Sequence, residues 1–425
     1  MTIAFFIRSV TNGGAERVAA ALSIIWSELG HKVVLITQMP PSDNEFAHKC
    51  VGREIFDTRH VTRKGIQQLH SKHCFEVAIF NDALDSEWFD IAFTLIGELK
   101  LVKRVIISHH PFTNWMYTLS CKCDFLKVPL FSQADAFISV DAIHALWWRY
   151  RGCKSLYVPN PFAVGFGSDV QYRPSHDIVW MGRVLDRCKQ FPLALKVFCQ
   201  VAMVDEEATF KVLGTLSENE KRRFIDGLPK SIRGRVSFLG FVASPGRIIA
   251  GAGLYMFTSN SEATIPQVVL ETLSSGVPIV AYDIPDLRQL TEEDGVVKVR
   301  ECGEMVSDMA AATIKLLNDP ERLRVLSQGA IQYIEHRRRS SPTLKLWKGL
   351  FDSFALGGVS AFIEAQAGMF TDDATYQRMC DEFHHAGMNF IRRFLPELIS
   401  YRTLRQRLDP RYIVKRMFSK LKLMA

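Results

Sequence analysis

The stretch from Leu254 to Asp283 reads as a strand, a polar loop, a helix and a second strand. Leu254–Phe257 and Val277–Tyr282 are short apolar runs of the kind that form buried strands. Between them, apolar side chains recur at helical spacing after Pro266, which suits a first helical turn, and Gly276 ends the pattern. A helix that joins two buried strands in this way is typical of an α/β fold.

Two carboxylates frame this unit. Glu262 lies in the loop before the helix, and Glu271 lies roughly 7–8 Å beyond Pro266 at about 1.5 Å per residue. The free N–H groups and the dipole of a helix N-terminus attract phosphate, and a carboxylate further along can accept hydrogen bonds from sugar hydroxyls. Both glutamates could instead be ordinary solvated side chains.

The chain of 425 residues is too long for one ordinary core, so we expect two domains. A hydrophobic content of 48% with 23% charged residues is typical of a folded enzyme. No apolar run reaches the ~20 residues of a membrane-spanning helix, and the N-terminus does not resemble a secretory signal. Nine irregularly spaced cysteines then favour reduced thiols and a cytoplasmic location.

The first part of the chain continues the alternation. Ile3–Ile7, a turn with Gly13 and Gly14, a helix and a strand from His31 form a β-α-β opening. The two glycines would let a ligand approach the backbone at the helix N-terminus, although the GxGxxG fingerprint is absent. A tight turn without a ligand is the alternative interpretation.

Two histidines follow a later strand directly. His109 and His110 come after Val105–Ser108, at the strand end where doubly wound sheets bind ligands. They could donate to a sugar hydroxyl or a phosphate, or they could be surface histidines. A strand that leads into Pro159 and Pro161 predicts the end of the first domain.

A second alternating series begins with the strand His176–Met181. The loop after it holds Gly182, Arg183 and Lys189, and two cations in one loop suit the charges of a diphosphate. Phe241 follows a further strand and could cover a base. The predicted fold class is therefore α/β, with two Rossmann-like doubly wound domains that face a cleft, plus a helical basic C-terminal extension.

Five segments, taken in order, resemble the retaining glycosyltransferases of the GT-B fold, family 4, which includes many bacterial polysaccharide and lipid-linked oligosaccharide enzymes. They span about residues 1–356. The segments are Gly13-Gly14-Ala15-Glu16-Arg17, Val158-Pro159-Asn160, Gly182-Arg183 with Lys189, Val236–Gly240, and Glu262–Gly276.

The resemblance implies four parts of the chain. Residues 1–160 would form an acceptor domain and residues 161–341 a nucleotide-sugar donor domain. Residues 342–358 would be a helix that crosses back to the first domain, with Trp347 and Leu350 as anchors. Residues 359–425 lie beyond the resemblance and are expected to form the helical basic extension.

Roles for single residues also follow from the resemblance. Arg183 and Lys189 would bind the diphosphate and stabilise the leaving group. Glu271 would hold the ribose hydroxyls, and Glu262 would contact the transferred sugar. His109 or His110 would lie near the reacting sugar. Residues 264 to 268 would contact the donor through backbone N–H groups. The implied donor-contacting residues are Gly13, Gly14, Gly182, Phe241, Thr264, Ile265, Gln267 and Val268.

Two positions depart from the family pattern. The family usually has seven residues between its two glutamates, whereas eight lie between Glu262 and Glu271, so that the first family glutamate falls on Ala263. Either the loop holds one extra residue and Glu262 still reaches the sugar, or that contact is lost. Gln190 stands where glycine is common after Lys189.

The predicted function is the retaining transfer of a hexosyl or N-acetylhexosaminyl group from a nucleotide diphosphate sugar to a glycan or lipid-linked acceptor, in the synthesis of cell-surface polysaccharide or glycoconjugate. UDP is favoured over GDP. No cofactor is expected, and the lack of a DxD signature in a suitable loop favours a metal-independent reaction. The alternatives are a sugar-nucleotide epimerase of the same fold and a non-catalytic scaffold derived from the transferase.

The C-terminal segment from Ile391 to Ala425 is basic and amphipathic. It contains ten Lys and Arg residues and two acidic residues, with apolar side chains between them. This pattern favours contact with an anionic membrane surface, here the inner face of the cell membrane. A helix packed on the first domain and a partner-binding tail are the alternatives, and no nucleic-acid partner is expected.

Overall fold

The structure is a computed structural model. It describes residues 1–7, 14–37, 53–55, 61–81, 87–109, 129–161, 171–242, 245–260, 262, 264–300 and 305–367. The chain divides into two compact units, residues 1–367 and 368–425, and all described residues belong to the first. The predicted basic segment 391–425 therefore lies outside the described residues.

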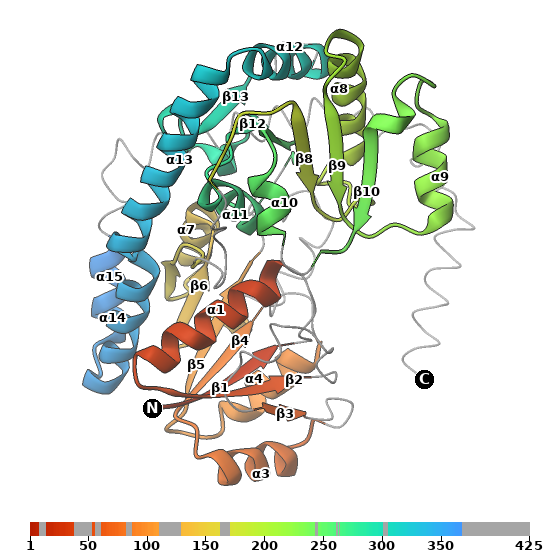
Figure 1. The fold of residues 1–425 in the computed structure, drawn as a ribbon. Coiled ribbons are helices and arrows are strands. Elements are labelled where there is room, and N and C mark those ends of the chain that lie inside the picture. The colour runs from red at the N-terminus through yellow and green to blue at the C-terminus, as the bar shows by residue number, and fades with distance from the viewer. Residues whose placement is uncertain are drawn as a thin grey trace, which may run out of the picture. The chain divides into compact units, whose positions relative to one another are not determined.

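The first sheet is parallel, with the strand order β3-β2-β1-β4-β5-β6-β7 among the described residues (Figure 1). The order runs outward from β1 on one side and from β4 on the other, so the point of reversal lies between them. The strands are β1 (Thr2–Ile7), β2 (Lys32–Thr37), β3 (Arg53–Ile55), β4 (Val77–Asn81), β5 (Lys103–Ser108), β6 (Ala136–Ser139) and β7 (Ser155–Tyr157). The helices are α1 (Gly14–Glu28), α3 (Arg63–His73), α4 (Glu87–Ile96) and α7 (Ala142–Tyr150).

The second sheet repeats this plan in the order β10-β9-β8-β11-β12-β13, with the reversal between β8 and β11. Its strands are β8 (Asp177–Met181), β9 (Thr209–Leu213), β10 (Val236–Gly240), β11 (Leu254–Phe257), β12 (Ile279–Tyr282) and β13 (Val296–Val299). Its helices are α8 (Phe191–Val204), α9 (Glu218–Asp226), α10 (Gly246–Ala250), α11 (Gln267–Ser274), α12 (Met305–Leu317) and α13 (Pro320–Ser340), with short 3₁₀ turns η3 (Arg233–Arg235), η4 (Pro285–Leu287) and η5 (Glu292–Asp294). The prediction of two doubly wound α/β sheets is confirmed.

Both faces of the first sheet are covered, which explains why its central strands are apolar throughout. In β1, Ile3 and Phe5 belong to one buried core, whereas Ala4 and Phe6 belong to the core on the opposite face. Successive side chains of a strand point to opposite faces, so a strand with a core on each side needs an uninterrupted apolar run.

Helix α14 (Pro342–Leu356) returns to the first sheet after α13. Its Trp347 packs edge-on against Trp26 of α1, with 4.8 Å between the ring centroids, and Leu350 is buried in the same core. The chain then turns at Gly357 and continues as α15 (Val359–Ala367), which packs beside α14 (Figure 1). Trp347 and Leu350 thus anchor this helix in the core of the first sheet.

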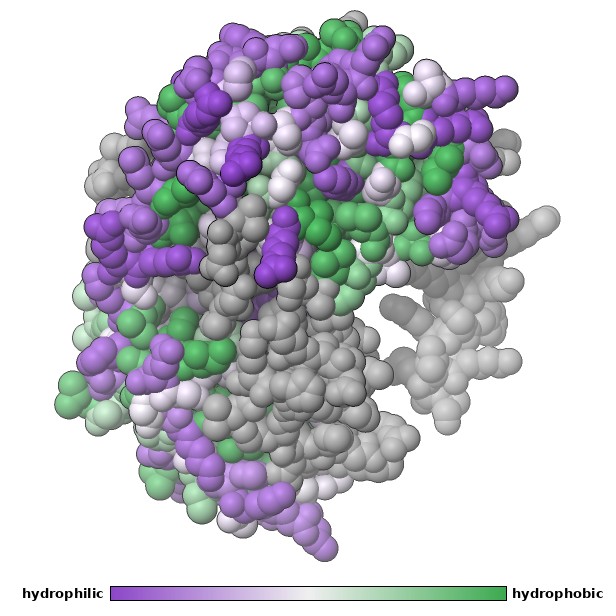
Figure 2. Space-filling view, viewed as in Figure 1, coloured by the Kyte–Doolittle hydropathy of each residue, from purple (hydrophilic) through white to green (hydrophobic). Residues whose placement is uncertain are grey.

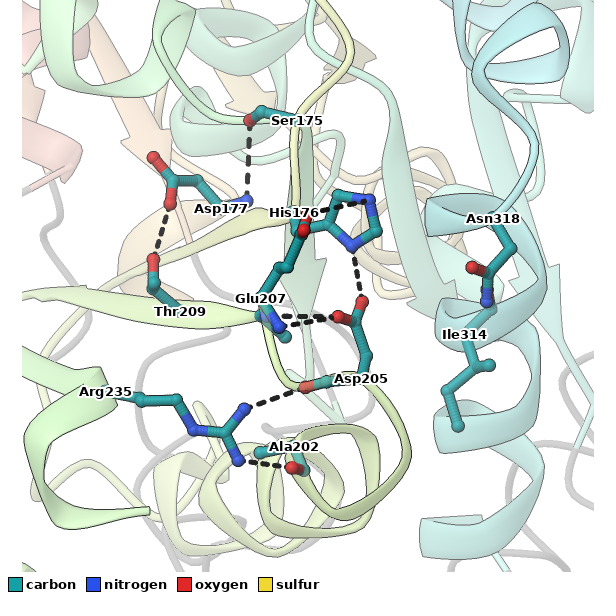
Figure 3. A network of polar contacts seen from close by, with 11 residues as sticks. Ser175, His176, Asp177, Ala202, Asp205, Glu207, Thr209, Arg235, Ile314 and Asn318 are labelled. Carbon is teal, nitrogen blue, oxygen red and sulfur yellow. Dashed lines mark hydrogen bonds and ion pairs between the residues drawn. The ribbon is translucent and has the colours of Figure 1, made fainter. Parts of the chain in front are cut away.

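A polar network supports the amino-terminal edge of the second sheet (Figure 3). The side chains of His176 and Asp205 are hydrogen-bonded at 2.5 Å, and Asp205 also accepts from the backbone N–H of Glu207 at 3.0 Å. Arg235 donates to the carbonyl oxygens of Asp205 and Ala202. Because this network joins the end of α8 to the starts of β8 and β10, it lies at the edge opposite the carboxyl ends of the strands.

The surface is polar where the long helices are exposed. Figure 2 shows mainly hydrophilic residues along α13, whose last turn holds three consecutive arginines, Arg337, Arg338 and Arg339. Within the described ranges, none of the helices is both long enough and apolar enough to cross a bilayer.

Candidate functional site

The carboxyl ends of β8 and β11 bring together the two loops that the sequence singles out. These strands are hydrogen-bonded neighbours, and the strand order reverses between them. Doubly wound sheets bind ligands at this point, outside the carboxyl ends of the strands. The loop after β8 carries Gly182, Arg183 and Lys189, and the loop after β11 carries Glu262 and Thr264.

Hydrogen bonds hold these two loops against each other. The indole N–H of Trp180 donates to Thr258 Oγ1 at 3.0 Å, and the same hydroxyl donates to the carbonyl oxygen of Lys189 at 2.9 Å. Two residues further on, the N–H of Asn260 donates to the carbonyl oxygen of Cys188 at 2.9 Å. The backbone position of Lys189 is therefore set by the loop after β11.

Lys189 and Glu262 form an ion pair in which both side chains are largely buried. The backbone N–H of Glu262 also donates to Asp286 Oδ2 at 2.9 Å, which anchors the loop. Glu262 thus lies beside Lys189 although eight residues separate it from Glu271. Its neighbours Ser261 and Ala263 lie outside the described residues.

Asp286 is a residue of this site that the sequence prediction missed. It lies in η4, shortly after β12, which is the next strand to β11. Burial, followed by the charge of Asp141, raises the pKa of Asp286 well above its usual range, and the N–H of Glu262 opposes this rise. An acidic residue soon after a strand that ends at the ligand edge is the signal that would have found it.

Arg183 lies apart from this cluster. Its side chain is 83% exposed and pairs with Asp186 of its own loop at 2.6 Å. Lys189 instead faces Glu262, so the two cations of the predicted diphosphate clamp have different partners. Gly182 packs closely in the same loop, because a Cβ atom there would lie 3.1 Å from the ring of Trp180.

Glu271 is the fifth residue of α11 and its side chain is only 2% exposed. It forms an ion pair with Arg17, the fourth residue of α1, so the pair joins a helix of the first sheet to a helix of the second. Burial raises the pKa of Glu271 to about 7, although the charge and hydrogen bond of Arg17 act to lower it. Glu271 Oε2 is buried and has no hydrogen-bond partner among the described residues.

The N-terminus of α11 lies between these two glutamates. The sequence predicts Pro266 in the first helical turn, and this prediction is wrong. In the structure Pro266 is the N-cap of the helix, with an extended backbone (φ −65°, ψ 153°) and no side-chain hydrogen bond. Thr264 and Ile265 are buried beside it, and Val268 is half-buried. The side chain of Gln267 donates to the carbonyl oxygen of Pro161 at 2.9 Å, so it holds the segment between the two sheets.

The predicted residues of the first sheet are placed only in part. His109 Nε2 lies 2.8 Å from Asn81 Oδ1; Asn81 ends β4, and His109 directly follows the neighbouring strand β5. Gly14 begins α1 and is exposed, and nothing lies within 4 Å of the Cβ atom that a larger residue would add. Gly13 and His110 lie outside the described residues.

Two further points complete the site. Phe241 follows β10 and is half exposed, so its ring is accessible. No group of three or more His, Cys, Asp or Glu side chains that could hold a metal ion occurs in the described part of the chain.

Residues 175–319 match the family model of the group 1 glycosyl transferases. The chain is 23% identical over 234 residues to a phosphatidyl-myo-inositol mannosyltransferase of Mycobacterium leprae, a match that covers 53% of this chain and 61% of that protein. The chain therefore spans less than two-thirds of that relative. It is also 22% identical over 377 residues to an uncharacterized glycosyltransferase of Haemophilus influenzae, covering 82% of this chain and 99% of that protein.

Solved structures share the fold. HepE of Anabaena, solved in complex with UDP, superposes with a TM-score of 0.65 at 15% identity, over 83% of this chain and all of that one. The matched residues 175–319 contain β8 to β13 and the paired loops around Lys189, Glu262 and Glu271. The described part of the chain therefore has the two-sheet GT-B fold of these structures, and its residues 175–319 are similar to the group 1 glycosyl transferases.

Proposed function

We propose that this protein is a retaining, metal-independent glycosyltransferase that moves a hexosyl or N-acetylhexosaminyl group from a nucleotide diphosphate sugar to a glycan or lipid-linked acceptor. The observation that carries the proposal is the carboxylate of Glu271, one helical turn into α11 at the ligand edge of the sheet. Its Oε2 is buried without a hydrogen-bond partner among the described residues. Buried acceptors normally have a partner, and a ribose hydroxyl of the donor would supply one here.

The donor we propose is a UDP-sugar, in preference to a GDP-sugar. HepE, which shares the fold at low sequence identity, has been solved with UDP and with UDP-glucose. Phe241, accessible after β10, is proposed to cover the base.

The diphosphate would bind at Lys189 and the N-terminus of α11. In the structure the charge of Lys189 is matched by Glu262, so an arriving diphosphate would compete with this carboxylate for the ammonium group. The N–H groups of the first turn of α11 add a second source of positive potential. Together they would neutralise the departing nucleoside diphosphate, which is the main electrostatic requirement of the reaction.

The proposed reaction retains the configuration of the sugar. The bond between the anomeric carbon and the phosphate oxygen breaks, and the acceptor hydroxyl attacks the same face of the sugar. The acceptor proton passes to an oxygen of the leaving phosphate. No pair of catalytic carboxylates is then required, in contrast to glycoside hydrolysis.

The activity is tested by incubating the full chain with labelled UDP-glucose, UDP-N-acetylglucosamine and GDP-mannose in the absence of an acceptor. We expect slow hydrolysis of one UDP-sugar. An epimerised nucleotide sugar would favour the epimerase instead, and no binding of any of the nucleotide sugars would favour a non-catalytic scaffold.

Two substitutions test the assignment of the donor site. Lys189→Ala and Glu271→Ala should each lower donor turnover at least about a hundredfold, the scale expected when electrostatic stabilisation of the transition state is lost. Lys348→Ala is the matched control, because this lysine pairs with Asp352 on the exposed side of α14. Near wild-type turnover in both site variants would contradict the donor-site assignment.

A further inference from the structure

The ion pair between Arg17 and Glu271 connects residues that are 254 positions apart in the chain. Arg17 lies in the first turn of α1, where the helix dipole disfavours a positive charge. It is nevertheless 9% exposed, and its guanidinium donates to Glu271 Oε1. A buried arginine in an unfavourable place for its own helix indicates that the contact serves the partner carboxylate.

We propose that Arg17 is a positioning residue of the donor site, which holds Glu271 by Oε1 so that Oε2 is left to accept a hydrogen bond from the nucleotide ribose. This inference rests on the proposed function, because it takes Glu271 as the ribose ligand. It differs from a structural role in one respect: Arg17 acts on nucleotide affinity through the orientation and charge of Glu271.

The electrostatics of the pair support this role. Burial alone favours the protonated carboxyl of Glu271, and Arg17 is the charged group that opposes this effect. Tyr255 of β11 also interacts with Glu271, and burial raises the pKa of Tyr255 so that it remains neutral. An ionised carboxylate accepts stronger hydrogen bonds than a neutral carboxyl group, so Arg17 also favours the form of Glu271 that is the better acceptor.

The shape of the side chain matters as well as its charge. A guanidinium presents several donors in a fixed plane, whereas an ammonium group is a single flexible point of charge. Lysine at position 17 would therefore preserve the charge beside Glu271 but hold the carboxylate less firmly. This difference separates an effect of charge from an effect of orientation.

The test measures the dissociation constant of UDP by calorimetry between pH 6 and pH 9, for the full chain and its variants. The wild type should bind UDP more tightly as the pH rises through about 7, where Glu271 ionises. Arg17→Ala should weaken binding at pH 7 by about tenfold, the scale of one charged hydrogen bond, and the deficit should shrink towards pH 9. At pH 7 the dissociation constant of UDP for Arg17→Lys should lie between those for the wild type and Arg17→Ala.

Arg235→Ala is the matched control. Arg235 is also a partly buried arginine, but it donates to backbone carbonyls at the opposite edge of the second sheet (Figure 3). Its loss should lower thermal stability and leave the dissociation constant and its pH profile unchanged. If Arg17→Ala does not fold, Arg17→Lys decides the question by the same two measurements.

A double substitution shows whether Arg17 acts through Glu271. In a chain that already carries Glu271→Gln, adding Arg17→Ala should change UDP affinity less than twofold. A folded Arg17 variant with wild-type affinity and pH profile would overturn the inference alone. A wild-type chain that binds no nucleotide would overturn the proposed function, and the inference with it.

Discussion

Gln190 adopts a left-handed backbone conformation, with φ 53° and ψ 38°, at the start of α8. This conformation costs a residue with a side chain about 1–2 kcal/mol, and glycine adopts it freely. The geometry therefore explains why glycine is common after the lysine in the family pattern.

Two substitutions at Gln190 should have opposite effects on stability. Gln190→Gly should be neutral or stabilising by up to about 1 kcal/mol, because relief of strain is partly offset by the greater freedom of the unfolded chain. Gln190→Val should cost about 1–3 kcal/mol, since a β-branched residue fits this conformation poorly. Urea unfolding measures both, and equal stabilities would contradict the strained geometry.

Glu271 should make stability depend on pH. Burial raises its pKa from 4.5 in the unfolded chain to about 7 in the folded protein, so the folded state holds the proton more tightly. The corresponding stability is fully present below about pH 4.5 and is lost as the pH rises to about 7. Urea unfolding between pH 4.5 and 8 should show this decline in the free energy of unfolding of the wild type. In Glu271→Gln the pH dependence should be weaker, by the contribution of about one proton. Identical pH dependence in the two proteins would count against the buried carboxylate.

At the scale of elements, helix α11 lies where its own residues favour a helix. α11 begins after Pro266 and ends at Ser274, before Gly276, which has φ 68°. The short or exposed elements escaped prediction for a related reason. β3 has three residues and α9 buries none of its side chains, so neither shows the apolar pattern on which such predictions depend.

Helix α14 should contribute much of its stabilising effect through one side chain. Trp347 is 1% exposed and packs against Trp26 and Phe351, so Trp347→Ala should lower the free energy of unfolding by about 3–5 kcal/mol. Leu356 is 86% exposed on the same helix, and Leu356→Ala should change the free energy of unfolding by about 0.5 kcal/mol or less. Denaturant unfolding of the two variants provides the comparison, and similar values would refute the packing role.

At the scale of the whole molecule, side chains of the second half bind the backbone that follows the first sheet. Thr343 donates to the carbonyl oxygen of Pro159 at 2.8 Å, and Arg337 donates to that of Asn160 at 3.2 Å. With Gln267 on Pro161, three consecutive carbonyls are held by α13, α14 and α11. These contacts fall where the sequence predicts the boundary between domains of residues 1–160 and 161–341. That boundary stays a prediction.

The C-terminal segment carries a prediction for the molecule as a whole. We propose that the ten basic residues from Ile391 to Ala425 attach the enzyme to the inner face of the cell membrane. Removal of residues 391–425 should weaken binding to vesicles of anionic lipid, measured by co-sedimentation, and leave UDP affinity unchanged. Neutral vesicles are the control, and unchanged binding to anionic vesicles would exclude the membrane role.

The sequence by itself determined the two doubly wound sheets and the loops that carry the candidate site. Both depend on local features: the length of an apolar run, the helical spacing of buried residues, and the polar loop that follows a strand. Lys189, Glu262 and Glu271 could be named for this reason. The loops of Lys189 and Glu262 follow neighbouring strands of one sheet, and Glu271 lies in the helix after the second loop. The family pattern orders all three in the chain.

The tertiary structure alone decided the partners of these residues. Arg17 reaches Glu271 across 254 positions, and Asp286 holds the backbone of Glu262 from η4, which follows the next strand. No local pattern predicts such contacts, because they depend on how the two sheets and their loops pack. The same packing buries Glu271 and raises its pKa to about 7, and neither the burial nor the raised pKa could be predicted from the sequence.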